Sequence, residues 1–204
     1  RLFAELPAHL EAMALFAVNT GCRDREVCRL QWKWEQKLSN NYSVFIIPDQ
    51  FVKNGEDRLV VLNKVAQEVV EAQRSKHTDF VFTYKGKPIG RMLNHAWCKA
   101  RARAKLLQVR VHDLKHTFGR RLRSAGVSFE DRQDLLGHKS SRITTHYSAA
   151  ELDNLIFAAN QACRHLREDK PESLLNPNKK SFLAHAKLTQ ANFDVSESRA
   201  DFSL

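Results

Sequence analysis

A β-hairpin signal stands out in a chain whose other apolar residues recur mainly at helical spacing. Two β-rich runs, Ser43–Ile47 and Arg58–Leu62, lie on either side of the dipeptide Asn54-Gly55. Asn-Gly is a strong turn signal because both residues tolerate a positive φ. The spacing therefore predicts an antiparallel hairpin made of the two runs, with Lys53 near its tip.

Most of the remaining chain has the apolar spacing or the capping residues of α-helices. The predicted helices cover residues 7–19, 23–30, 63–75, 91–106, 112–126, 128–137 and 150–166, and another begins at Ser140 or Ser141 and contains Tyr147. A third short strand is expected at Asp79–Phe82. These elements predict one domain that is mainly α with a small antiparallel β-sheet, which is an α+β fold.

Excess positive charge is confined to part of the chain. There are 33 Lys+Arg and 23 Asp+Glu, which gives a formal net charge of +10. Residues 166–204 contain six side chains of each sign, so the excess lies in residues 1–165, and residues 101–147 alone hold 11 basic and 4 acidic side chains. Such a field attracts phosphate backbones, anionic membranes or acidic proteins. We expect a folded domain over 1–165 and a polar tail over 166–204.

Composition excludes several other classes of protein. No apolar run approaches the roughly 18 residues that a membrane-spanning helix needs, so no membrane partner is expected. The four cysteines, at positions 22, 28, 98 and 163, are too few and too far apart for a disulfide scaffold or a zinc site. They fit a reducing, cytoplasmic setting. The chain begins with Arg1 rather than Met, so we expect a fragment that lacks an upstream part.

Three polar runs carry Arg, His and Tyr residues in a recognisable order. Residues 20–32 contain Arg23, residues 112–118 read His-Asp-Leu-Lys-His-Thr-Phe, and residues 135–147 contain Gly-His-Lys-Ser and end in Thr-Thr-His-Tyr. Together with the hairpin Lys53, these runs resemble the conserved boxes of the tyrosine recombinases, also called phage integrases. The resemblance covers roughly residues 8–165. It implies the tyrosine recombinase catalytic-domain fold.

The resemblance also implies an enzyme that cuts DNA with a tyrosine nucleophile. Tyr147 would attack a DNA phosphate, form a 3′-phosphotyrosyl link and release a 5′-hydroxyl that Lys53 protonates. Arg23, His112 and His138 would hold the phosphate, because positioned cations and donors stabilise the charge that develops on its oxygens. The bond energy stays in the covalent link. Neither ATP nor a metal is therefore required, and no cofactor is expected.

Position 115 departs from the family pattern. The second box usually reads His-x-x-Arg, whereas this chain has Lys115. Lysine keeps the positive charge but lacks the planar guanidinium that bonds two oxygens at once. Lys115 either fills the role of the second arginine, with transition-state binding weaker by roughly a few kcal/mol, or marks a degraded or altered site. Taken alone, Lys53 is an ordinary turn lysine and Tyr147 an ordinary core-edge residue.

Metal binding is not expected at the histidines. His112 and His116 have the spacing of a metal-binding pair, but no third ligand or Glu follows the metalloprotease pattern.

Double-stranded DNA is the partner that charge and resemblance both favour. Candidates for DNA-facing charge are Arg101, Arg103, Arg110, Arg120, Arg121, Arg123 and Arg142. Family members act as tetramers on paired sites and often dock the segment after the tyrosine onto a neighbour. The helix over 150–166 could do this, and the 166–204 tail is either disordered or docked on a neighbouring protomer.

The implied function is integration or excision of a phage or mobile element in a bacterial nucleoid or phage-infected host. A catalytically impaired DNA-binding or regulatory relative that retains the fold is the main alternative. A type IB topoisomerase-like enzyme is another.

Overall fold

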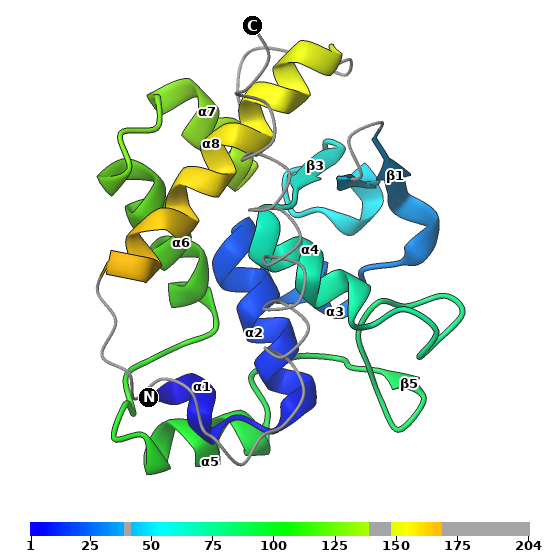
Figure 1. The fold of residues 1–204 in the computed structure, drawn as a ribbon. Helices are drawn as coiled ribbons and strands as arrows, with labels where there is room; N and C mark the ends of the chain where they lie inside the picture. Colours follow the sequence, from blue (N-terminus) through cyan, green and yellow to red (C-terminus); the bar gives the residue numbers. More distant parts are fainter. Residues whose placement is uncertain (39–41, 139–147, 169–204) are drawn as a thin grey trace, which may run out of the picture. The chain divides into compact units, whose positions relative to one another are not determined.

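The computed structural model describes residues 1–38, 42–138 and 148–168. In this part of the chain helices dominate, as Figure 1 shows, which confirms the expected α+β class. The helices are α1 (Leu2–Glu5), α2 (Ala8–Thr20), α3 (Asp24–Cys28), α4 (Lys64–Glu71), α5 (His95–Arg103), α6 (His112–Ser124), α7 (Phe129–Leu136) and α8 (Ala149–Glu168). The strands are β1 (Glu35–Lys37), β2 (Ser43–Ile47), β3 (Arg58–Val61), β4 (Thr83–Tyr84) and β5 (Lys87–Pro88). None of the helices in the described ranges is long and apolar enough to cross a membrane.

The predicted hairpin is confirmed. β2 and β3 pair antiparallel, with Phe45 opposite Val60 and Ile47 opposite Arg58. Gly55 has a φ of 69°, which is the left-handed conformation that the Asn-Gly signal predicts. The connecting loop, residues 48–57, contains the short 3₁₀ helix η2 (Asp49–Phe51) and Lys53, so it is longer than a tight two-residue turn.

The third strand of this sheet is β1, so the strand predicted at Asp79–Phe82 is wrong. Within that run only Phe80 makes a β-bridge, to Gln31. The N–H of Val81 donates to the carbonyl of Leu30, and the Val81 side chain is buried in the main core. Burial of Val81 and Phe82 in the main core, and not membership of the β1–β3 sheet, accounts for the apolar residues of this run.

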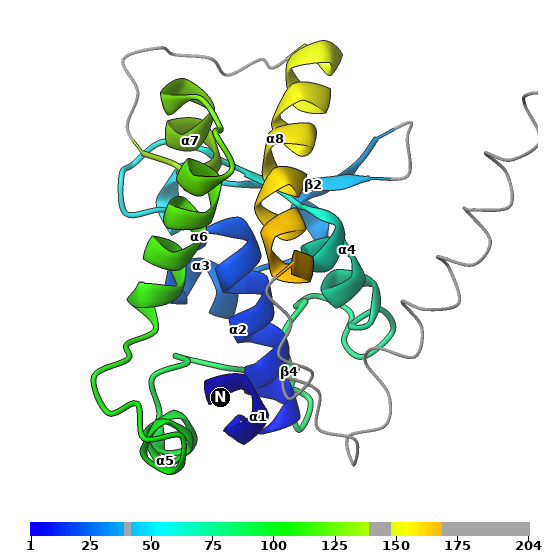
Figure 2. The ribbon, with the colours of Figure 1, turned by 60° about the vertical axis from the view of Figure 1, so that its left-hand side comes forward.

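α2 is the central helix of the fold. It contacts α4 on one side and α6 on the other, and Figures 1 and 2 show it between them. Leu10, Met13 and Phe16 have no exposed surface, and Ala17 and Val18 are also buried. A helix that is apolar on most sides belongs inside a core. The C-terminal end of α2 is consequently held firmly, and the chain leaves it directly toward Arg23.

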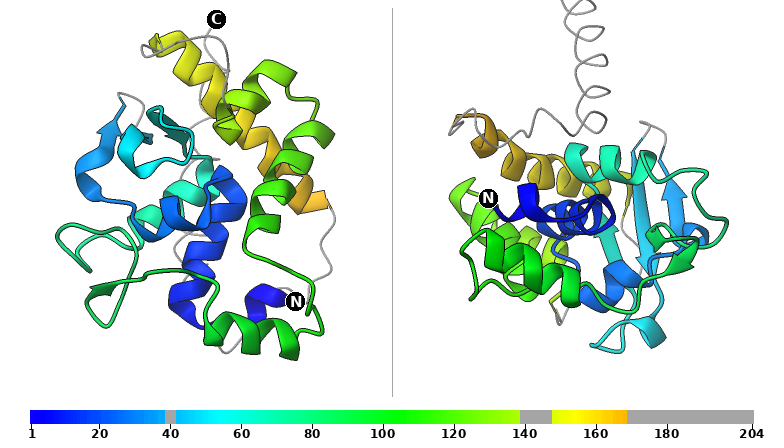
Figure 3. Two further views of the ribbon diagram at one scale, coloured as in Figure 1. Left: turned by 180° about the vertical axis from the view of Figure 1, so that it is seen from behind. Right: turned by 90° about the horizontal axis from the view of Figure 1, so that it is seen from below.

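A second hydrophobic cluster joins α6, α7 and α8 to β3. It includes Phe118 and Leu122 of α6, Leu135 of α7, Ile156 of α8 and Val61 of β3. In Figure 3 the sheet and α6 lie on opposite sides of α2, and the edge strand β3 contacts α7 and α8. This cluster brings the end of α7 close to the start of β3.

Several predicted helix ends form as expected. Asn63 Oδ1 accepts a hydrogen bond from the N–H of Ala66 at 2.9 Å and begins α4, and Ser128 caps α7 through the N–H of Asp131 at 3.0 Å. α8 covers the helix expected at 150–166. The helix expected around Tyr147 lies outside the described residues.

Replacing Asn63 by Ala should destabilise the fold by about 2 kcal/mol. Asn63 is fully buried, and its Nδ2 also donates to Asn19 Oδ1 at 3.1 Å, so alanine removes a helix cap together with a buried side-chain hydrogen bond. Urea unfolding followed by circular dichroism measures the loss. Ser128→Ala, which removes a solvent-exposed cap, is the matched control and should cost about 1 kcal/mol or less. Equal losses in the two variants would contradict this account.

Candidate active site

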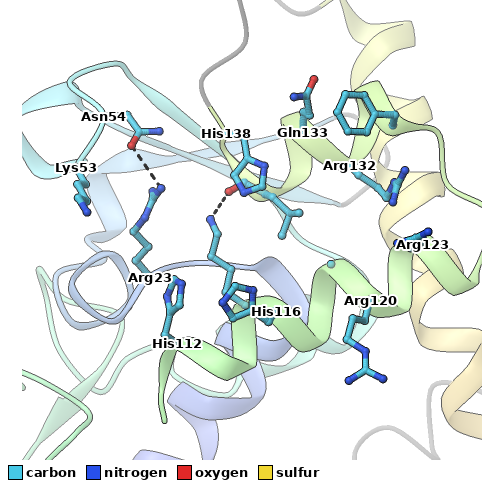
Figure 4. A pocket seen from close by; sticks show the side chains of 14 residues that line it. Arg23, Lys53, Asn54, His112, His116, Arg120, Arg123, Arg132, Gln133 and His138 are labelled. Carbon is cyan, nitrogen blue, oxygen red and sulfur yellow. Dashed lines mark hydrogen bonds between the residues drawn. The ribbon is translucent and has the colours of Figure 1, made fainter.

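A pocket of about 580 Å³ lies where the start of α3, the β2–β3 loop, α6 and the end of α7 meet. Its lining includes five of the six catalytic candidates from the sequence, drawn in Figure 4: Arg23, Lys53, His112, Lys115 and His138. The sixth, Tyr147, lies outside the described residues. The fold thus gathers candidates from four separate segments around one cavity.

Arg23 is fixed at the start of α3 by two neighbours. Its backbone N–H donates to Glu26 Oε2 at 2.7 Å, and its Nη1 donates to Glu26 Oε1 at 2.9 Å. Its Nη2 donates to Asn54 Oδ1 at 3.4 Å, a contact dashed in Figure 4. The Arg23 side chain remains 21% exposed at the pocket wall. A guanidinium held in this way is suited to binding two phosphate oxygens.

Glu26 is a buried counter-charge for the site. Its side chain is 2% exposed, and Oε2 lies 3.4 Å from Nε of Arg58. Burial by itself raises the pKa of the Glu26 carboxyl, but the charge of Arg58 and the hydrogen bonds from Arg23 bring that pKa below its ordinary value. Glu26 is therefore ionised at neutral pH and orients both guanidinium groups.

Lys115 is buried on α6, with 5% of its surface exposed. Its ammonium donates to the backbone carbonyl of Leu136, the last residue of α7. Burial, followed by the charges of Arg58 and Arg23, lowers the pKa of Lys115 to about 7. An arginine would stay charged at any physiological pH. The departure at position 115 thus changes protonation as well as hydrogen-bond geometry.

His112 and His138 enter the site as neutral imidazoles. Burial, and then the charges of His116 and Lys115, lower the pKa of His112, while burial, and then Lys115 and Arg23, lower that of His138. The rings of His112 and His116 lie edge to face, with centroids 4.6 Å apart. A neutral imidazole offers one donor and one acceptor. Each can hydrogen-bond a phosphate oxygen or accept a proton.

The end of α7 presents His138 to the pocket. The N–H of His138 donates to the carbonyl of Gln133 and that of Gly137 to Asp134, both at 3.0 Å, which is a Schellman motif. Gly137 has a φ of 57°. A Cβ at this position would lie 2.1 Å from Nη1 of Arg58. Both the backbone conformation and the close approach of Arg58 therefore require glycine before His138.

The β2–β3 loop contacts the same helix end. Asn54 Nδ2 donates to the carbonyl of Gly137 at 3.3 Å, so Asn54 links Arg23 to the segment that carries His138. Figure 4 shows Lys53 and Asn54 beside Arg23, whereas Arg123 and Arg132 lie at the opposite end of the pocket. The hydrogen bonds of Asn54 thus hold the loop against Arg23 and Gly137, and the neighbouring Lys53 lines the cavity.

The arginines expected to face DNA divide into separate groups. Arg120 and Arg123 line the pocket, while Arg103 and Arg110 form ion pairs with carboxylates. Arg142 lies outside the described residues. The pocket arginines extend its positive charge along α6.

Sequence reasoning missed three contributors to the site. Asn54 was used only as a turn signal, and Arg132 was not singled out although it lines the pocket. Arg58 was taken as the first residue of a β-strand, yet it is only 3% exposed. The available signal was a charged residue at the head of the apolar run 59–62, since such a charge is buried only with partners.

Neither the cysteines nor the histidines form a metal or disulfide site in the described part of the chain. No disulfide occurs there. No group of three or more His, Cys, Asp or Glu side chains is placed there to hold a metal ion.

The chain is similar in sequence to known proteins. The profile of the Phage integrase family matches residues 3–153. The integrase of Salmonella phage P22 is 29% identical over 174 residues, which are 79% of this chain and 44% of that protein. The chain therefore spans less than half the length of this curated relative.

Two solved structures are also similar. One is the XerH site-specific recombinase bound to its difH substrate in a pre-cleavage complex, with 23% identity, a TM-score of 0.49 and coverage of 74% of this chain and 47% of that one. The other is the Tn1549 transposon integrase in complex with circular intermediate DNA, with 17% identity, a TM-score of 0.49 and coverage of 72% and 56%. Such TM-scores add no argument to the sequence match. Because the family profile covers well over half of the residues and includes the segments of Arg23, Lys53, His112 and His138, the chain belongs to the phage integrase family.

Proposed function

We propose that this chain is the catalytic domain of a site-specific DNA recombinase that cuts and rejoins strands through a 3′-phosphotyrosyl intermediate. It would integrate or excise a phage or mobile element. The convergence of Arg23, Lys53, His112, Lys115 and His138 on one pocket carries this proposal. Membership of the phage integrase family supports it independently.

The pocket suits a phosphodiester in its transition state. Attack at phosphorus builds negative charge on the non-bridging oxygens, which positioned cations and hydrogen-bond donors stabilise. Arg23 supplies a fixed guanidinium, and His112 and His138 supply neutral donors. Lys115 adds a cation when it is protonated, and a bound phosphate favours that state because the opposite charge raises the pKa of an amine.

The proposed reaction needs only groups of the chain and the DNA. The Tyr147 oxygen attacks phosphorus, the bond from phosphorus to the 5′-oxygen breaks, and Lys53 donates a proton to the departing oxygen. The tyrosine proton passes to a neutral imidazole, that of His112 or His138. Rejoining runs the steps in reverse, with the 5′-hydroxyl as the nucleophile. The covalent link retains the bond energy, so the proposal includes no metal and no ATP.

We also propose how the chain is divided, where it acts and how it assembles. Residues 1–165 form the catalytic body and residues 166–204 a polar tail, either disordered or docked on a neighbouring protomer. The chain acts on double-stranded DNA in the cytoplasm of a bacterium or a phage-infected host, as a tetramer on paired sites. The arginines along α6 support DNA as the partner, because they extend the positive charge beyond the pocket.

A catalytically impaired DNA-binding relative is the second candidate function. Lys115 favours it, because its ammonium donates to a backbone carbonyl and loses its charge near neutral pH. In that case the same pocket would bind a phosphate without cleaving the strand.

Tyr147→Phe should abolish covalent DNA attachment. A duplex nicked next to the cleavage site loses its short 5′-hydroxyl fragment on cleavage, which traps the adduct, and the adduct is seen as a shifted band on a denaturing gel. The test uses DNA from the element that encodes the chain. Wild type should form the band and Tyr147→Phe should not, while both bind the duplex equally. Binding by wild type without any adduct would favour the impaired relative.

Lys115→Arg should preserve or raise the cleavage rate, with the larger gain at alkaline pH. In the wild type the Lys115 amine is charged below its pKa of about 7 and loses that charge as the pH rises through this value. A bound phosphate raises the pKa of Lys115 and so moves this loss of charge to higher pH. Arginine stays charged throughout. The ratio of variant to wild-type single-turnover rates should therefore increase from pH 7 to pH 9 by roughly tenfold or more. A clear loss of activity at every pH would show that lysine is specifically adapted to this position.

A further inference from the structure

We propose that Arg58 is a positioning residue whose buried guanidinium joins the ends of α2 and α7 and so sets Arg23 and His138 at the spacing that one phosphate requires. The proposal rests on the recombinase function above, because it concerns the same site. It assigns a role to a side chain on β3 that lies outside the three sequence boxes.

Arg58 donates to the ends of two helices at once. Nη2 donates to the carbonyls of Gly21 at 3.2 Å and Thr20 at 3.4 Å, and Nη1 donates to the carbonyl of Leu136 at 2.7 Å. The last carbonyls of a helix have no partner within the helix and carry the negative end of its dipole. A buried cation that bonds both ends satisfies these groups and ties the two helices together.

Each of these helix ends leads directly into the site. Arg23 lies two residues beyond Gly21, and His138 lies two residues beyond Leu136. Both helices end in a left-handed glycine, with a φ of 66° at Gly21 and 57° at Gly137. A shift of either helix end would therefore displace the side chain that is proposed to bind the phosphate.

Arg58 also supports Arg23 through Glu26. Its Nε lies 3.4 Å from Glu26 Oε2, the oxygen that accepts from the backbone N–H of Arg23. Arg58 is buried and, unlike Lys115, is not among the residues that line the pocket, so it is not placed to contact a DNA phosphate itself. It acts on the reaction through the residues it holds, which makes it a positioning residue and not a catalytic one.

Electrostatics give this role a signature that a purely structural role lacks. The charged and titratable groups that shift the pKa of Lys115 are Arg58 from β3 and Arg23, Glu26 and Cys22 from the α3 region. Lys115 in turn lowers the pKa of two histidines, His112 on α6 and His138 at the end of α7. After burial, the charge of Arg58 lowers the pKa of Lys115 most. Removing that charge should therefore raise the pH at which Lys115 loses its proton.

The test compares Arg58→Met and Arg58→Lys with a matched arginine away from the site. Arg74 serves as the control, because it donates to Glu35 at 2.8 and 2.6 Å and to Glu71 yet is not part of the pocket. The readouts are the rate of adduct formation on nicked DNA, the dissociation constant for intact duplex, and the pH profile of cleavage. All are measured at a temperature where circular dichroism shows each variant folded.

Arg58→Met should slow adduct formation by roughly a hundredfold, since small displacements of catalytic groups have effects of that order. Its affinity for duplex should stay within about threefold of wild type, because the exposed cations that provide binding are intact. The alkaline limb of its pH profile should move upward. Arg58→Lys should keep the wild-type profile but also slow cleavage, because one ammonium cannot reach both helix ends. Arg74→Met should cleave like wild type.

The proposal is overturned if Arg58→Met cleaves as fast as Arg74→Met, or if it loses affinity in proportion to its loss of rate. A wild-type protein that forms no adduct would instead refute the recombinase function itself. If Arg58→Met does not fold at the assay temperature, Arg58→Lys decides alone, and wild-type cleavage rates in that variant overturn the role.

A double-mutant cycle tests the geometry without any activity measurement. Gly137→Ala places a methyl group against the Arg58 guanidinium as well as straining the backbone. Its loss of urea midpoint should be smaller in the Arg58→Met background than in wild type, because only the backbone strain remains. Equal losses in the two backgrounds would show that Arg58 does not lie against Gly137, and would overturn the proposed link.

Discussion

The ion pair between Arg58 and Glu26 lies where α2, α3, β3 and α7 come together, and the site is built around it. A buried ion pair gains little by itself, because the cost of removing two charges from water offsets their attraction. Here Nη1 and Nη2 of Arg58 donate to backbone carbonyls, Nε makes only the ion pair and no hydrogen bond within the described part of the chain, and Glu26 accepts from Arg23 twice. These hydrogen bonds offset the cost of burying the two charges. They also fix the positions of the ends of α2 and α7 and of the start of α3.

Lys115 shows the cost of adding another cation to this environment. It shares the Leu136 carbonyl with Arg58, and both side chains are almost fully buried. Burial, and then the charges of the two nearby guanidinium groups, lower the pKa of this amine to about 7. The charge of the pocket thus depends on pH, and a phosphate bound there would favour the protonated amine.

Local signals made much of the fold predictable from the sequence. The Asn63 and Ser128 caps and the glycine after α7 each depend on a few adjacent residues, and each appears as expected, while the Asn-Gly signal marks the loop of the hairpin without forming a tight two-residue turn. β1 could not be foreseen in the same way. Its residues Glu35–Lys37 are polar, with no β-rich pattern, and they form a strand because the free edge of β2 is available to pair with.

In the candidate site, too, the sequence predicted the residues that belong to local motifs and missed those whose partners are distant in the chain. Arg23, His112 and His138 belong to contiguous boxes, and Lys53 is marked by its turn, so sequence pattern alone was enough to select them. Arg58 was not selected because its partners are the carbonyls of residues some 37 and 78 positions away, and a backbone carbonyl has no sequence signature. Only the tertiary structure shows that this strand residue donates hydrogen bonds to the C-terminal ends of two helices.

The excess of cations in the pocket also bears on the solution around the protein. With Glu26 already shared between two guanidinium groups and no carboxylate among the described residues that line the pocket, the pocket is short of negative charge, which a small oxyanion would supply. Sulfate or inorganic phosphate would then act as a counter-ion that raises the free energy of unfolding and competes with DNA for the same hydrogen-bond donors. The choice of buffer anion would therefore change apparent stability and apparent DNA affinity in opposite directions, beyond the effect of ionic strength alone.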